Sequence, residues 1–161
     1  IRDVRHFSAG DTLRIGGVSV ETIPTPHDGA DGVAFVIDDG RRRLGVLTDL
    51  GHVFRELEEV VGTLDAVLLE SNYDRNMLAT GPYPEFLKRR IAGPGGHLSN
   101  DEAAEMLLAR ASPRLQWACL AHLSEENNSP AVALQTHRRV LRDRMPIHVA
   151  TRYGASGIME A

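Results

Sequence analysis

The sequence has little of what marks several large protein classes. Its single cysteine, Cys119, lies in the apolar run LQWACLA, so a disulfide framework is excluded and a buried free thiol in a reducing cytoplasm is expected. No apolar run is long enough to cross a bilayer. The net charge of −4 argues against a surface that attracts nucleic acid all over, but it is compatible with a local basic patch. We therefore expect a cytoplasmic protein without a membrane segment.

The hydrophobic pattern of the 161 residues predicts strands first and more helices later, with no repeat or linker between them. Strands are expected over residues 18–26, 33–37, 44–47, 66–69, 115–121 and 147–150. Helices are expected over residues 52–61 and 84–91, after the capping box at 99–102, and from Ser129-Pro130 to about Arg144. This order of elements indicates a mixed α/β layered architecture.

Ionisable side chains follow the ends of these predicted strands. His27 follows VETIPTP, Asp49 follows LGVLT, Glu70 follows AVLL and His122 follows LQWACLA. Strand ends in layered α/β folds converge on one rim, where ligands bind. Imidazole and carboxylate groups together suit zinc, manganese or iron. Lone histidines are more often structural, and spacing alone leaves that reading open.

The other histidines lack this context. We expect His6, His137 and His148 to be structural, and His52 to be a surface residue at a helix start.

Several segments resemble a known superfamily. TPHD, a hairpin and then LTDLG resemble the later metal motifs of the metallo-β-lactamase superfamily. ESNYDRNML, GPYPEFLKRRIAGPGGHLSN and LAHLSEENNSP resemble its YycJ/WalJ branch, bacterial enzymes regarded as 5′-to-3′ exonucleases on double-stranded DNA. The resemblance spans nearly the whole chain. It implies that residues 1–161 are the C-terminal portion of one domain, an αββα sandwich whose N-terminal half is missing.

The resemblance also implies residue roles. His27 corresponds to a ligand of one metal ion, Asp49 to the carboxylate that bridges two, and His122 to a ligand of the second. Glu70 and His97 correspond to a pair that transfers a proton near the scissile phosphate, although His97 could instead brace its glycine-rich loop. Two divalent ions, zinc or manganese, are the cofactors expected.

Four residues are candidates for contact with DNA. Lys88, Arg89 and Arg90 form a basic cluster suited to backbone phosphates, or simply a solvated helix face. Asn72 could position Glu70 or touch the nucleic acid, and a turn-stabilising role is an equal alternative.

The superfamily motif HxHxDH, which supplies the other metal ligands, does not occur in these residues. We expect it upstream of Ile1. The chain by itself should then be inactive, hold metal incompletely, and associate with another copy or with the missing half.

The function predicted for the complete protein is hydrolysis of DNA phosphodiesters by two metal ions, with DNA as the partner. Two alternatives stay open. One is an RNase or small-molecule phosphodiesterase on the same fold, and the other is a metal-free scaffold domain without activity.

Overall fold

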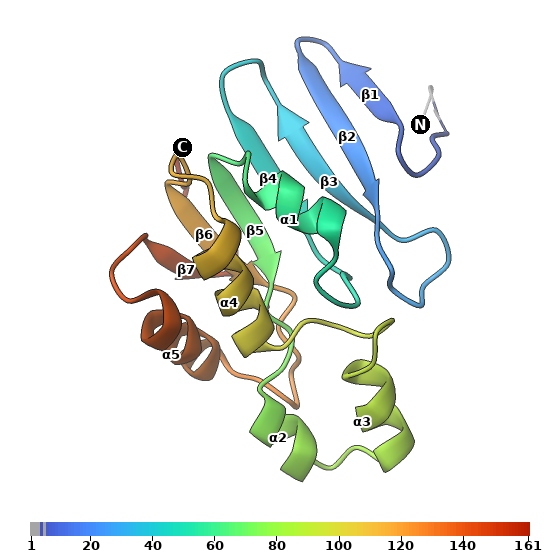
Figure 1. Ribbon diagram of the computed structural model, residues 1–161, viewed down its shortest axis with the longest axis vertical. Coiled ribbons are helices and arrows are strands. Elements are labelled where there is room, and N and C mark those ends of the chain that lie inside the picture. The colour runs from blue at the N-terminus through green and yellow to red at the C-terminus, as the bar shows by residue number, and fades with distance from the viewer. Residues whose placement is uncertain (1–3, 5) are drawn as a thin grey trace.

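One sheet organises the molecule. The computed structural model describes residue 4 and residues 6–161. Its seven strands lie side by side in sequence order (Figure 1): β1 (Thr12–Ile15), β2 (Val18–Pro24), β3 (Val33–Asp38), β4 (Arg43–Leu47), β5 (Ala66–Glu70), β6 (Trp117–Ala121) and β7 (Ile147–Val149). Pairs from β1 to β4 are antiparallel, and those from β4 to β7 are parallel. Strands β2, β4, β5 and β6 therefore all end at the same edge.

The helices are α1 (Arg55–Val61), α2 (Arg75–Thr80), α3 (Glu85–Ile91), α4 (Asn100–Arg110) and α5 (Pro130–Leu141). Helices α1, α4 and α5 cover one face of the sheet, and α4 packs against both of the others (Figure 1). Helices α2 and α3 lie beyond the end of β5. Among the described residues, no helix combines the length and apolar character needed to span a membrane.

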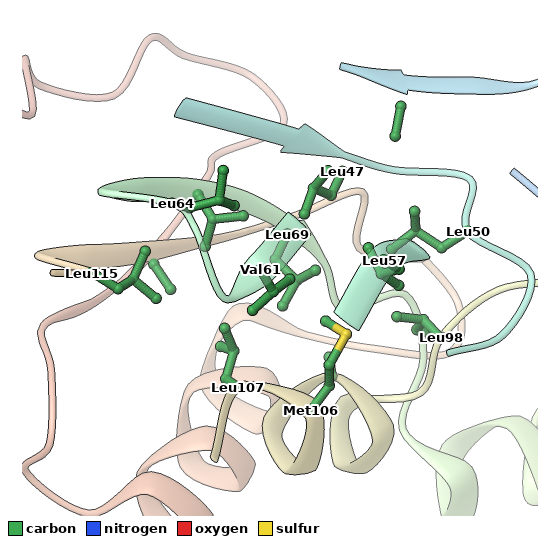
Figure 2. Close-up of a cluster of buried hydrophobic side chains, with 14 of the residues drawn as sticks. Leu47, Leu50, Leu57, Val61, Leu64, Leu69, Leu98, Met106, Leu107 and Leu115 are labelled. Atoms are coloured by element: carbon green, nitrogen blue, oxygen red, sulfur yellow. The ribbon is translucent and has the colours of Figure 1, made fainter. Parts of the chain in front are cut away.

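The core fills the space between the sheet and α1 and α4 (Figure 2). Leu47 and Leu69 project from the strands towards Leu57, Val61 and Leu107 of the helices, and these side chains are almost completely buried. Burial of such side chains stabilises the fold by about 1.5–3 kcal/mol each. The packing fixes the strands, and with them the edge where β2, β4, β5 and β6 end.

The opposite face of the sheet is also apolar. Cross-strand registers place two rows of side chains there, Phe35–Val46–Leu68–Cys119 and Ile37–Leu44–Ala66–Trp117. Five of the eight, all on β3, β4 and β5, are only partly buried. The C-terminal segment covers the β6 end of these rows, where Met159 packs and the Trp117 indole donates to the Glu160 carbonyl at 2.8 Å.

The predicted mixed α/β architecture is confirmed, with shifts at some element ends. The first helix begins at Arg55 rather than 52, so His52 lies outside it. Helix α5 ends at Leu141 because Arg142 has a φ of 53°, which stops the helix. Strand β1 and helix α2 were not predicted, since segments this short carry no clear periodicity. The capping box is present, with Ser99 and Glu102 each bonding the other's backbone N–H.

Candidate functional site

The common edge of the sheet gathers the candidate residues. His27, Asp49, Glu70 and His122 lie at or just beyond the ends of β2, β4, β5 and β6. His97 arrives on the loop between α3 and α4. Residues far apart in sequence thus meet because four strands run in one direction and stop together.

Asp49 is the centre of the cluster. Its Oδ1 lies 3.5 Å from His27 Nε2, 3.8 Å from His122 Nε2 and 4.0 Å from His97 Nδ1. Its side chain is 43% exposed, so it can be reached from solvent. The spacings are too long for strong direct hydrogen bonds but suit groups that share a cation.

The rings of His27 and His122 have the same orientation relative to Asp49: a partner holds Nδ1, and Nε2 faces the Asp49 carboxylate. His27 Nδ1 donates to the Gly96 carbonyl at 2.8 Å, and because a carbonyl only accepts, its Nε2 carries the lone pair. His122 Nδ1 bonds Glu70 Oε1 at 3.0 Å, which likewise leaves Nε2 towards Asp49. Metal-binding histidines in proteins are oriented in this way by a partner on the other nitrogen.

His97 is turned differently. Its Nδ1 bonds the same Glu70 Oε1 at 2.6 Å, so one carboxylate oxygen joins His97 and His122. The second oxygen of Glu70 accepts from the Leu50 backbone N–H at 2.9 Å. The family resemblance paired Glu70 with His97, but it did not indicate the bonds of Glu70 to His122 and Leu50.

Glu70 is completely buried, and its partners keep it ionised. Burial raises the pKa of its carboxyl group, but the hydrogen bonds from His122 and His97 outweigh burial and bring the pKa down to about 2. The bond to Glu70 in turn raises the pKa of His122, against the effect of burial. Glu70 is therefore an anion that fixes two imidazole rings.

Two residues of the cluster have unusual backbones. Asp49 has a φ of 55° and His122 a φ of 57°, in the left-handed region that residues other than glycine rarely adopt. Each lies just after a strand, so the reversal turns its side chain out of the sheet's alternation and towards the centre. Such conformations cost about 1 kcal/mol or more and are concentrated at functional sites.

Glycines bring the loops together. Gly51 has a φ of 71°, and a Cβ there would lie 2.6 Å from the Pro94 carbonyl oxygen. A Cβ on Gly96 would collide with the carbonyls of Arg90 and Ile91. The loop after β4 can therefore touch the loop that carries His97 only because Gly51 lacks a side chain, and the latter loop can pack against the end of α3 only because Gly96 lacks one.

The side-chain amides of buried asparagines hold the backbone segments that carry the site residues. Asn128 Nδ2 donates to the carbonyls of Ser71 and Asn72 at 2.8 and 3.0 Å and lies 2.9 Å from Asn100 Oδ1. Asn72 Nδ2 donates to the His122 carbonyl at 2.8 Å. Asn72 therefore braces the backbone of His122, a role that the sequence did not suggest, and its contact with nucleic acid stays a prediction. Nothing in the sequence marked Asn100 or Asn128.

Two residues of the predicted basic cluster, Lys88 and Arg90, form hydrogen bonds with other residues of this chain. Lys88 Nζ donates to the Ala79 carbonyl at 2.7 Å, and only 14% of its side chain is exposed. Arg90 bonds both oxygens of Asp28, at 2.6 and 3.0 Å, and this hydrogen bond lowers the pKa of Asp28. Arg89 is exposed beside a hollow of about 440 Å³ between α2 and α3. Contact of these residues with DNA stays a prediction.

The donor set fits a divalent metal. Among the described residues, two groups of three have ligand atoms within 4.8 Å of one another: His27–Asp49–His97 and Glu70–His97–His122. Ligands of a tetrahedral zinc ion lie about 3.3 Å apart, close to the 3.5 Å between His27 Nε2 and Asp49 Oδ1. Two imidazole nitrogens and an exposed carboxylate are suitable ligands, but too few for two closed sites.

Comparison with known proteins bears on this arrangement. A family described as "Beta-lactamase superfamily domain" matches residues 1–122. Exodeoxyribonuclease YycJ of Bacillus anthracis is 33% identical over 138 residues, 86% of this chain and 52% of the relative. Exodeoxyribonuclease WalJ of Streptococcus pneumoniae serotype 2 is 34% identical over 132 residues, 81% of this chain and 48% of the relative. The chain spans about half the length of these curated relatives.

Solved structures agree on the fold. The metallo-β-lactamase fold protein YhfI of Bacillus subtilis has a TM-score of 0.64 at 16% identity, covering 90% of this chain and 52% of YhfI. Zn²⁺-bound PqqB of Methylobacterium extorquens has a TM-score of 0.59 at 17% identity, covering 89% of this chain and 48% of PqqB. At such low identity, the likeness concerns the fold alone.

Proposed function

Because this chain belongs to the β-lactamase superfamily domain family, we propose that the complete protein is a metal-dependent phosphodiesterase that degrades double-stranded DNA from its 5′ ends. The observation that carries the proposal is the cluster around Asp49, where ring nitrogens from three histidines lie within 4.0 Å of one carboxylate oxygen. The names of the relatives, at 33–34% identity, support the choice of DNA as substrate.

In this proposal His27 and His122 would hold divalent metal ions through Nε2, and the Asp49 carboxylate between the two rings would serve as their shared ligand. The HxHxDH motif expected upstream would complete both ligand sets. Divalent cations in such sites activate water at neutral pH and neutralise charge on the phosphate.

In this proposal His97 donates the proton that the leaving group needs. An alkoxide leaving group needs protonation at neutral pH, and histidine is the side chain best suited to give it. Glu70 holds His97 Nδ1 at 2.6 Å, so the transferable proton is on Nε2. The buried Glu70 anion fixes the ring in this orientation, with Nε2 as the nitrogen that gives up the proton.

The test is degradation by the full gene product loaded with zinc or manganese. Linear duplex DNA labelled at either the 5′ or the 3′ end, closed circular DNA, RNA and a cyclic nucleotide are compared. We expect linear duplex DNA to yield mononucleotides, with the 5′ label released before the 3′ label. Closed circular DNA should not be cleaved. Asp49→Asn should abolish the activity, whereas Asp143→Asn, an exposed aspartate after α5, should leave it unchanged.

Other outcomes would redirect the assignment. Cleavage of RNA alone or of the cyclic nucleotide alone would make the protein an RNase or a small-molecule phosphodiesterase. Lack of hydrolysis on every substrate, together with lack of metal binding, would leave the metal-free scaffold.

Metal analysis of the 161-residue chain tests the ligand set separately. After dialysis against a chelator and re-addition of zinc, we expect less than one tightly held ion per chain, because affinity depends on the number of ligands and the closure of the site. Tight stoichiometric zinc in this chain would show that the ligands are other than His27, Asp49 and His122.

A further inference from the structure

Two cavities open beside His122, and His27 lines neither of them. The smaller, of about 300 Å³, is lined by both His97 and His122, and the larger has a volume of about 830 Å³. Both are lined by His122, Leu123, Ser124 and Arg152. The C-terminal segment that carries Arg152 therefore lines cavities next to the candidate metal site. The sequence of this segment, TRYGASG, did not suggest such a position.

Arg152 is the only lysine or arginine that lines either cavity, among the residues that the structure describes. It donates to the Leu123 carbonyl at 2.9 Å, and its NH1 lies 4.0 Å from Glu125 Oε2. Its side chain is 47% exposed, so the guanidinium is anchored yet open to solvent. Arginine has more N–H groups than these contacts use, and its planar fork matches phosphate oxygens.

The smaller cavity is lined mainly by polar side chains, with a few apolar or aromatic ones among them. Tyr83, from the segment between α2 and α3, and Ile91 of α3 line it together with Leu123. Tyr83 is half-buried, which restricts the ring without covering it. An aromatic ring on such a wall is a stacking surface for a nucleic-acid base. A volume of 300 Å³ is at the small end of ligand cavities and suits one nucleotide rather than a duplex.

We propose that this smaller cavity binds the terminal nucleotide of the DNA strand, with Arg152 on a phosphate and Tyr83 against the base. The inference rests on the proposed function and adds to it a place for the strand end. A single-nucleotide cavity next to His97 and His122 aligns the first phosphodiester bond with these two side chains, so the products are mononucleotides. Arg152 is thus a substrate-binding residue.

Binding is measured by calorimetry on the full gene product with three probes: dAMP, deoxyadenosine and inorganic phosphate. Arg152→Gln should weaken dAMP binding by about 10- to 100-fold, the effect of losing a hydrogen bond to a charged group. Arg152→Lys should lie in between, because it keeps the charge but not the fork. Arg144→Gln, an exposed arginine after α5, removes the same charge away from both cavities and should have no effect.

Tyr83→Leu separates the two halves of the ligand. It should weaken dAMP and deoxyadenosine by about tenfold and leave phosphate binding unchanged, whereas Tyr83→Phe should bind like the wild type. In hydrolysis of linear duplex, Arg152→Gln should raise KM with kcat within about twofold, since the contact is made equally before and during the reaction. Thermal melts of each variant exclude unfolding as the cause.

The outcomes separate this inference from the proposed function. If the wild type hydrolyses DNA but dAMP fails to bind, or binds Arg152→Gln as it binds Arg144→Gln, the nucleotide cavity is wrong and the nuclease stands. If dAMP binding depends on Arg152 and Tyr83 while DNA is not hydrolysed, the cavity stands and the nuclease is wrong.

Discussion

At the residue scale, each site histidine uses its two ring nitrogens for different purposes. His27 and His122 engage Nδ1 with a fixed acceptor and keep Nε2 for Asp49. His97 offers Asp49 only the nitrogen that Glu70 already holds. Orientation therefore separates a pair suited to bind metal from a ring suited to move a proton, although the side chains are chemically identical.

This difference predicts what truncation does. In the full gene product, His97→Ala should lower turnover by about 10²–10⁴-fold with metal content unchanged, because general acid catalysis contributes that much. Glu70→Gln should act similarly, and the double variant should lose little more than the worse single one. His148→Ala, an exposed histidine on β7, is the control. Loss of metal from His97→Ala would instead make it a ligand or a brace.

His137 on α5 gives a prediction for stability against pH. Its side chain is fully buried, Nδ1 bonds the Ala133 carbonyl at 3.0 Å, and Nε2 has no partner among the described residues. Burial lowers its pKa, outweighing the Ala133 carbonyl and the charge of Asp101. The folded state therefore resists protonation of this imidazole.

Below about pH 6.5 an unfolded histidine takes up a proton that folded His137 refuses. Its contribution to stability is complete above pH 6.5 and is lost as the pH falls towards the lowered pKa, by at most about 1.4 kcal/mol per pH unit. Urea unfolding between pH 5 and 8 should show a smaller slope for His137→Leu than for the wild type. His148→Leu should keep the wild-type slope, and equal slopes for both variants would contradict the prediction.

At the element scale, the loop between α3 and α4 connects the candidate site to the loops that follow β2 and β4. It carries His97, accepts from His27 through the Gly96 carbonyl, and accepts from the exposed His52 through Pro94 at 2.8 Å. A methyl group added at Gly96 of this loop would have no room.

Gly96→Ala should therefore destabilise the protein by about 1–3 kcal/mol, since overpacking forces the backbone to shift. Activity should fall as well, because the shift disturbs the bond that orients His27. Gly17→Ala, in the turn between β1 and β2, meets nothing within 4 Å and serves as the matched control. Denaturant midpoints and turnover measure both effects, and wild-type values for Gly96→Ala would show that the loop can yield.

How much the sequence could predict also differs by element. Alternating strands, the capping box and the positions of His27, Asp49 and His122 follow from local pattern, because strand ends and caps are local events. The link between Gly51 and Pro94 depends on two loops meeting in space, and no spacing along the chain encodes it. The same holds for Arg152, whose glycine- and serine-containing segment has no periodicity. Glu70 and His97 could be paired only through resemblance to a family.

At the scale of the whole molecule, the sheet has two unequal faces. One is covered by α1, α4 and α5, and the other presents half-buried Phe35, Ile37, Leu44, Val46 and Leu68. Contiguous apolar surface of this kind favours contact with another protein surface.

The 161-residue chain by itself should therefore associate with itself at micromolar concentration, as sedimentation velocity would detect. Val46→Asp, in the middle of the apolar face, should shift the chain towards monomer. Leu108→Asp, which places the same charge on the outer side of α4 where Leu108 is 39% exposed, should not. A wild-type chain that stays monomeric over the whole concentration range would show that this face needs no partner.

The order of the strands has a further consequence, for synthesis on the ribosome. Each strand pairs with the one translated just before it, from β1 to β7. A nascent chain can therefore extend the sheet at its open edge, and no strand has to be inserted between two that are already paired. The helices α1 and α4 emerge before the strands that follow them and can cover the growing face at once. Only when β6 has left the exit tunnel does His122 reach Glu70, so the site closes late in translation.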